Sequence, residues 1–157
     1  MNIQQTEKIA KQFLAHTLPI EQWTHEAHLR VGLWHLLQFN PEECLNRLRS
    51  EIKSFNTSIG VTNTDTSGYH ETVTHFYIKM IAHFLSQQDT SRPIDDLAQD
   101  MLAVIGCKGI YMEYYSKDRL ISDKGRHNFI EPDLKPLPES KASNKKLKTE
   151  AQTARSV

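Results

Sequence analysis

Cysteines and long apolar segments are both scarce in this sequence. Only Cys44 and Cys107 occur, and their spacing fits neither a metal motif, a redox motif nor a disulfide framework. No apolar run approaches the roughly 20 residues that a membrane-spanning helix needs. The opening residues, MNIQQTEKIAKQ, are too polar for a secretory signal. These absences predict a cytoplasmic protein with no membrane partner.

A net charge of one sign is also missing, because 19 basic and 19 acidic residues cancel. No global field therefore favours nucleic acid or an anionic membrane. The charge is uneven, since residues 139–157 hold five Lys or Arg and two Glu, which gives +3 there and −3 over residues 1–138. The basic end has few apolar residues and no aromatic ring to stack on bases. We expect one helical domain over 1–138, a disordered basic tail over 139–157 and no nucleic-acid binding.

Helical periodicity is what the sequence does contain. Five segments repeat apolar residues at three- and four-residue spacing: 3–16, 25–39, one that begins at Pro41, one that begins at Ser67 or Gly68, and one that begins at Pro93. A short helix over about 110–119 and a turn over 123–126 follow, and three prolines in 132–138 exclude helix there. The sequence predicts an all-α fold, a compact bundle of five or six helices with a proline-rich C-terminal strap.

The first candidate site is the pair His25 and His28. Thr24 is a good N-cap, so both histidines lie in the first turns of a helix, three residues apart on one face. Two imidazoles at this spacing can share a metal ion. The alternative is structural, because Trp23 and His28 occupy the positions of a hydrophobic staple and can simply pack together.

The second candidate lies in the stretch of residues 60–85, where a threonine-rich loop leads into a long amphipathic helix. His70 opens the apolar stripe of that helix, so its imidazole should be partly buried and need a partner. Glu71 suits a fourth metal ligand or a general base, yet a carboxylate in a first helical turn also stabilises the helix with no further function. If the two helix starts converge, then His25, His28 and His70 form a cluster suited to zinc, iron or manganese.

The third candidate is the segment from Tyr114 to Arg119, together with Arg126. Tyrosine hydroxyls and guanidinium groups bind carboxylates and phosphates, and Arg119 and Tyr69 are the residues that we expect to contact a cofactor or ligand. The alternative is that the tyrosines pack and the arginines pair with Glu131 and Asp133.

Three blocks of the chain carry a resemblance. They are WTHEAHLRVGLWHLL, then GVTNTDTSGYHETVTHFY, then YYSKDRLISDKGRHNFIEPDLKPL. Together, over residues 20–137, they resemble a family of small bacterial proteins of uncharacterised activity with the pattern THxAHL, NTxTxGYHET, YYSxxRL and EPDL. That family implies a more helical stretch at residues 123–126. The resemblance lends no catalytic residues, but it marks a set of positions to examine first: Thr24, His25, His28, Asn63, Thr64, Gly68, Tyr69, His70, Glu71, Arg119 and Asp133.

The sequence thus predicts a metal-binding helical protein. In its catalytic form this is a small metal-dependent enzyme that acts on a polar small molecule, with Glu71 as the base toward metal-bound water. The alternative is a non-catalytic binding or regulatory module whose histidines are structural. A small-molecule ligand and a homo-oligomer are compatible with either.

Overall fold

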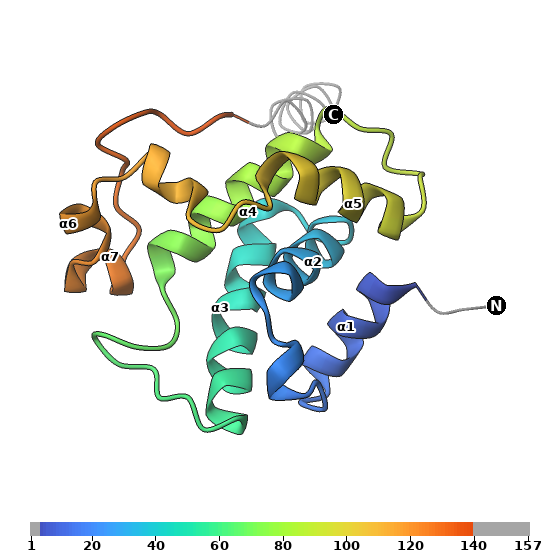
Figure 1. Ribbon diagram of the computed structural model, residues 1–157, viewed down its shortest axis with the longest axis horizontal. Coiled ribbons are helices and arrows are strands. Elements are labelled where there is room, and N and C mark those ends of the chain that lie inside the picture. The colour runs from blue at the N-terminus through green and yellow to red at the C-terminus, as the bar shows by residue number, and fades with distance from the viewer. Residues whose placement is uncertain (1–3, 140–157) are drawn as a thin grey trace, which may run out of the picture.

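The computed structural model describes residues 4–139, and its regular structure within that range is entirely helical (Figure 1). Two 3-10 turns accompany seven α-helices. In chain order the elements are α1 (Gln5–Leu14), η1 (Ile20–Gln22), α2 (His25–Leu36), α3 (Pro41–Ser58), α4 (Glu71–Leu85), α5 (Ile94–Ile105), η2 (Ile110–Glu113), α6 (Lys117–Leu120) and α7 (Asp123–His127). The predicted all-α bundle is confirmed. The predicted tail over 139–157 lies, apart from Glu139, outside the described residues.

Two apolar clusters hold the helices together, and α4 contributes to both. Phe76 of α4 is fully buried in a cluster with residues of α2, α5 and the segment after α5. Ile78, two residues further along α4, belongs to a second cluster with Leu48 and Phe55 of α3 and with residues of α1 and α2. The helix therefore lies between the two halves of the core, as the broad apolar face of its sequence indicates.

The helix starts and stops follow from local side-chain chemistry. The Thr24 hydroxyl accepts from the backbone N–H of Ala27 at 3.2 Å, and Asn40 caps α3 by accepting from the N–H of Glu43 at 2.9 Å. Gly60 follows the end of α3 with a φ of 83°, the left-handed conformation that commonly ends a helix. The predicted cap at Thr24 and the predicted start at Pro41 are confirmed.

Several predicted boundaries were wrong, among them the end of the segment 25–39, since α2 ends at Leu36. Helix α4 begins at Glu71 rather than at Ser67 or Gly68, because the residues of the preceding loop form hydrogen bonds with one another instead. The helix predicted over 110–119 divides into η2 and α6. The turn predicted over 123–126 is the short helix α7, whose N-cap Ser122 accepts from the N–H of Gly125 at 3.1 Å. The more helical stretch that the family resemblance implied there is therefore present.

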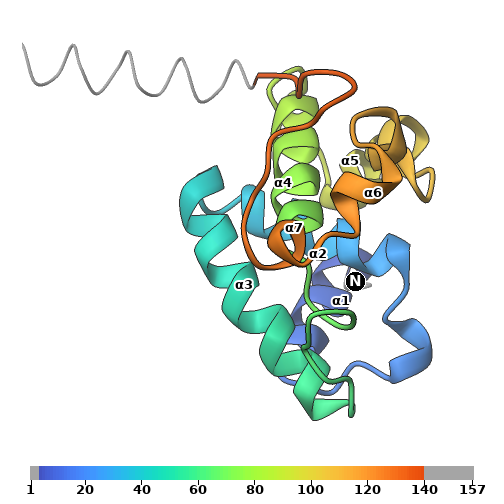
Figure 2. The same cartoon turned by 90° about the vertical axis from the view of Figure 1, so that its left-hand side faces the viewer.

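The proline-rich strap is confirmed as extended chain that runs beside α4 toward the C-terminal end of that helix (Figure 2). Its contacts are mostly to backbone. The Tyr115 hydroxyl donates to the carbonyl of Ile130 at 2.8 Å, the N–H of Leu134 donates to the carbonyl of Tyr114 at 2.9 Å, and the Asp133 carboxylate accepts from the N–H of Ser116 at 2.8 Å. The strap thus fastens α6 and its surroundings to the bundle.

Helices α1 and α5 are joined by a polar contact between their first turns. Asp95 accepts from the backbone N–H groups of Gln5 at 2.7 Å and Thr6 at 2.9 Å, which satisfies two donors at the start of α1. The buried guanidinium of Arg30 donates to the Thr6 hydroxyl at 2.6 Å and lies 3.5 Å from Asp95.

Within the described residues, no helix is long and apolar enough to cross a membrane.

Candidate functional site

The loop before α4 is organised around the side chain of Asn63. Its Oδ1 accepts from the N–H of Tyr69 at 3.0 Å and from Nδ2 of Asn56 at 3.2 Å, while its Nδ2 donates to the carbonyl of Lys53 at 3.1 Å. Gly68 has a φ of 80°, and a Cβ there would lie 2.6 Å from Asn63 Oδ1. Only glycine fits at this position, so the loop holds one shape and fixes where Tyr69 enters the molecule.

His70 is the N-cap of α4. Its Nδ1 accepts from the backbone N–H of Val73 at 3.2 Å, which places the ring proton on Nε2, and Nε2 donates to the carbonyl of Leu120 at 3.0 Å. Both ring nitrogens are therefore engaged. Burial is the largest influence on this imidazole and lowers its pKa, so the ring is neutral at pH 7. The histidine joins the start of α4 to the end of α6.

Tyr69, Glu71 and Arg49 form a charged network beside this cap. Arg49 holds the Glu71 carboxylate in a bidentate pair, with Nε at 2.9 Å from Oε1 and Nη2 at 2.6 Å from Oε2. The buried Tyr69 hydroxyl donates to Oε1 at 2.6 Å. Burial acts to raise the pKa of Glu71, but the bonds from Arg49 and Tyr69 outweigh it and hold that pKa below its usual range. Glu71 is thus an ionised, fully engaged carboxylate.

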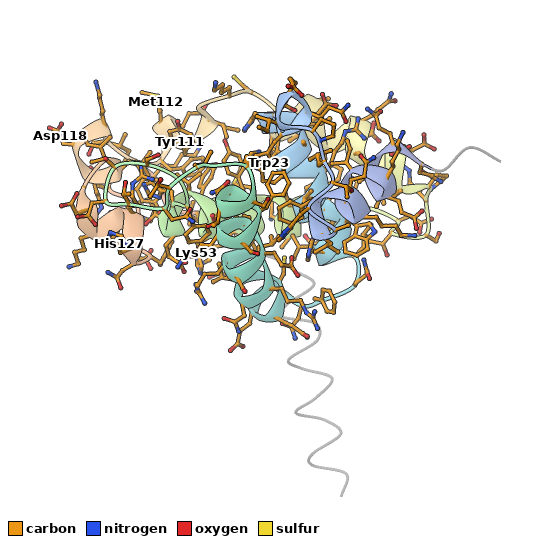
Figure 3. The ribbon with its side chains drawn as sticks, turned by 90° about the horizontal axis from the view of Figure 1, so that it is seen from below. Trp23, Lys53, Tyr111, Met112, Asp118 and His127 are labelled. Carbon is orange, nitrogen blue, oxygen red and sulfur yellow. The ribbon has the colours of Figure 1, made fainter. Side chains whose placement is uncertain are left out.

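A cavity of about 510 Å³ opens next to the network, between α3, the loop and α7. Its lining consists of Arg49, Lys53, Asn63, Thr64, Tyr69, Glu71, Arg126, His127, Asn128 and Phe129. In Figure 3 His127 of α7 lies toward the edge of the molecule, and Lys53 lies further in, beside α3. Polar and charged groups dominate this lining, which favours a polar ligand.

Two cations at this cavity have no carboxylate partner among residues 4–139. The Lys53 ammonium lies 5.1 Å from the ring centre of Tyr69, and Nη1 of Arg126 donates to the carbonyls of Gly68 at 3.1 Å and Tyr69 at 3.3 Å. Arg49 neutralises Glu71. Nε2 of His127 lies 2.6 Å from Oδ1 of Asp65, and Asp65 is not part of the cavity lining. The cavity therefore carries an uncompensated positive charge.

His25 and His28 line a different cavity, between α2, α3 and α4. The His28 ring stacks on Trp23 with ring centres 3.6 Å apart, and its Nδ1 donates to the carbonyl of Thr24 at 2.7 Å. His28 is exposed to solvent as a residue, yet desolvation by the surrounding protein atoms lowers the pKa of its imidazole to about 4. The stacking is the contact that the structural alternative predicts for Trp23 and His28.

The predicted site residues therefore divide among four places, one of which is the N-cap position of His70, outside the lining of either cavity. Tyr69 and Glu71 share the polar cavity, His25 and His28 share the second cavity, and Arg119 lies apart from both, where its Nε donates to the carbonyl of Glu131 at 2.6 Å. In the part of the chain that the structure describes, no group of three or more His, Cys, Asp or Glu side chains is placed to hold a metal ion. Binding of zinc, iron or manganese stays a prediction.

Five residues of the polar cavity were not identified from the sequence: His127, Asn128, Phe129 and, most important for its charge, Arg49 and Lys53 of α3. A signal was present for the last two, because they follow the buried or half-buried residues Leu48 and Ile52 and so lie four residues apart at the edge of the apolar stripe. Their partner, Glu71, is 22 residues away from Arg49 in the chain. That long-range pairing is what the local pattern does not contain.

Comparison of the chain with protein-family models, curated proteins and solved structures finds no match.

Proposed function

We propose that this protein is a binding module for a small anionic molecule that carries a carboxylate or phosphate group, held in the cavity of Tyr69 and Arg126. The observation that carries the proposal is the pair of cations, Lys53 and Arg126, that line one cavity without a carboxylate partner among the described residues. A guanidinium and an ammonium are the groups that proteins commonly use for such ligands.

Binding is a better fit than acid–base catalysis at this cavity. A general base needs a lone pair that is free to accept a proton from the substrate. Both oxygens of Glu71 accept hydrogen bonds from Arg49 or Tyr69, and its lowered pKa makes it a weak base. Burial, followed by the bond to Glu71, raises the pKa of Tyr69, so that hydroxyl stays protonated. The network supplies rigidity and leaves ligand contact to Lys53, Arg126 and Asn63.

Isothermal titration calorimetry with three matched probes tests the proposal. Glycerol, glycerate and glycerol 3-phosphate share a carbon frame and differ in the charge of one group. At least one of the two anions should bind, glycerol should not, and the affinity should fall as ionic strength rises. Lys53→Met and Arg126→Met should each weaken binding by at least about tenfold, since a charge-assisted hydrogen bond contributes roughly 1.5–3 kcal/mol and about 1.4 kcal/mol is a factor of ten.

Lys124→Met is the matched control for both variants. Lys124 is an exposed lysine on α7, two residues before Arg126 and outside the cavity lining. This variant removes one positive charge from α7, the helix that carries Arg126. Any change in affinity that is caused by net charge alone should therefore occur in this variant as well. The proposal is wrong if all three variants bind the anions as tightly as the wild type does, or if glycerol binds as tightly as its charged analogues.

A further inference from the structure

One aromatic ring lines the polar cavity without belonging to either apolar cluster. Phe129 follows α7, is half-buried, and is the one wholly apolar side chain among the described residues that line this cavity. It is absent from both of the clusters that hold the described helices together. Packing of the core therefore does not account for an aromatic ring at this place, beside a group of cations.

The backbone around Phe129 fixes the direction of its ring. The chain leaves α7 in extended form at Asn128, and neighbouring side chains on extended chain point to opposite sides. Ile130 is buried in the cluster that contains Phe76, which turns Phe129 away from the core. The hydroxyl oxygen of the buried Thr72 lies 2.9 Å from the carbonyl of Asn128 and accepts from the N–H of Ile130 at 3.3 Å. Both neighbours of Phe129 are thus fastened to α4.

One side of the Phe129 ring is already covered by α4. The ring centre of His75 lies 3.9 Å from that of Phe129, with an interplanar angle of 39°, and the Lys79 ammonium lies 5.7 Å from the same centre. Neither His75 nor Lys79 belongs to the lining of the polar cavity. The side of Phe129 that faces α4 is therefore not the side that borders the cavity, and the latter is open to a ligand.

The ring and the cations are close enough for one small molecule to contact both. Arg126 precedes Phe129 by three residues, so their Cα atoms are no more than about 11 Å apart. Lys53 lines the same cavity, whose volume is about 510 Å³. A carboxylate or phosphate group takes only the room of a few water molecules, about 30 Å³ each. Most of the cavity is therefore available to the body of the ligand, which Phe129 borders.

We propose that the ligand of the polar cavity is an aromatic anion, in which a flat ring lies against Phe129 and a carboxylate or phosphate contacts Lys53 and Arg126. The assignment of a ring depends on the proposed function, because the two cations hold the other half of the same molecule. Aromatic rings attract each other beyond the effect of the area that they bury, in offset-stacked or edge-to-face arrangements. Phe129 therefore selects a ligand whose apolar part is flat.

Isothermal titration calorimetry with two series of anions tests the aromatic part. The phosphates are benzyl phosphate, cyclohexylmethyl phosphate and methyl phosphate, and the carboxylates are phenylacetate, cyclohexylacetate and acetate. The first two members of each series have equal numbers of carbon atoms, and only the first has a flat ring. In the series that binds, the aromatic anion should bind about two- to tenfold more tightly than the cyclohexyl anion, and the smallest anion should bind most weakly.

Phe129→Leu should weaken binding of the aromatic anion to the level of the cyclohexyl anion and leave the affinity for the smallest anion unchanged. Phe129→Trp keeps an aromatic face and should keep the preference for the flat ring. Phe39→Leu is the matched control, and it should change none of the affinities. Phe39 is also half-buried and contacts a cation, with the Arg47 guanidinium 4.0 Å from its ring centre, but it lies outside the cavity lining.

The possible results separate the aromatic ligand from the anion site itself. If no member of either series binds, the proposed function fails and the aromatic ligand fails with it. If an anion binds but the aromatic and cyclohexyl members bind equally well, the anion site stands and the aromatic ligand is overturned. The same holds if Phe129→Leu leaves the preference unchanged, or weakens the smallest anion as much as the aromatic one, because Phe129 then only covers α4.

Discussion

Removing one oxygen atom, in Tyr69→Phe, tests the network that shapes the polar cavity. The hydroxyl is buried and donates to an ionised carboxylate at 2.6 Å. A hydrogen bond to a charged group contributes roughly 1.5–3 kcal/mol. Glu71 keeps its two bonds from Arg49 in the variant, so the carboxylate is not left without partners, and we expect a cost at the lower end, about 1.5–2 kcal/mol. In a domain of this size that lowers Tm by roughly 3–8 °C.

Urea unfolding followed by helix circular dichroism measures this cost directly. Tyr111→Phe serves as control, since its hydroxyl has no hydrogen-bond partner among residues 4–139 and its loss should cost less than about 0.5 kcal/mol. In Arg49→Met the buried carboxylate loses its charged partner and keeps only Tyr69, so the cost should exceed that of Tyr69→Phe, at about 2–4 kcal/mol. The double variant should be non-additive, because both side chains bond to the same carboxylate. If Tyr69→Phe is as mild as Tyr111→Phe, the network does not hold the site and the reasoning fails.

Three further outcomes follow from the same region. The pKa of Glu71 is lower in the folded chain than in the unfolded chain. The stability advantage of wild type over Glu71→Gln should therefore be complete above about pH 4.3 and shrink as the pH falls through the folded-state pKa. Urea unfolding measured at a series of acidic pH values checks this. Gly68→Ala should lower the free energy of unfolding by about 1–3 kcal/mol in the same urea melts, and by more than Gly60→Ala does. Both glycines have a positive φ, but only a Cβ at position 68 would clash with other atoms. Equal costs would mean that the loop changes its conformation to make room for the Cβ. For the predicted metal site, protein purified after growth with zinc, iron and manganese should retain near one ion per chain and lose it in His70→Ala but not in His83→Ala; metal-free wild type by elemental analysis would end that prediction.

The sequence was sufficient for the helices and for the faces that they bury. Leu48 and Phe76, which lie in the apolar stripes of their segments, are 3 % and 0 % exposed. Local rules are enough here, because helix periodicity and N-cap chemistry act within a few residues. The candidate site was predicted only in part. Tyr69 and Glu71 were chosen for two different candidate sites but line one cavity, whereas Arg49 and Lys53 were missed because they reach it through tertiary packing.

The histidines show that residue type alone does not predict which partner a buried side chain has. His70 was chosen because a partly buried imidazole needs partners, and that reasoning holds, but the partners are the N–H of Val73 and the carbonyl of Leu120. The second partner comes from 50 residues further along the chain, where the sequence pattern suggested a different boundary. Backbone groups satisfy a histidine as well as a metal does, and no spacing rule distinguishes the two.

The contact between Asp95 and the start of α1 has a consequence for how the chain is made. During synthesis α1 leaves the ribosome long before α5, so for about 90 residues of elongation its first N–H groups lack the carboxylate that satisfies them in the finished molecule. A ten-residue helix without its cap and without its packing partners is marginal in water. Helix α1 is therefore completed only after α5 has folded, and a nascent chain that ends before Asp95 should leave this segment open to proteases and chaperones.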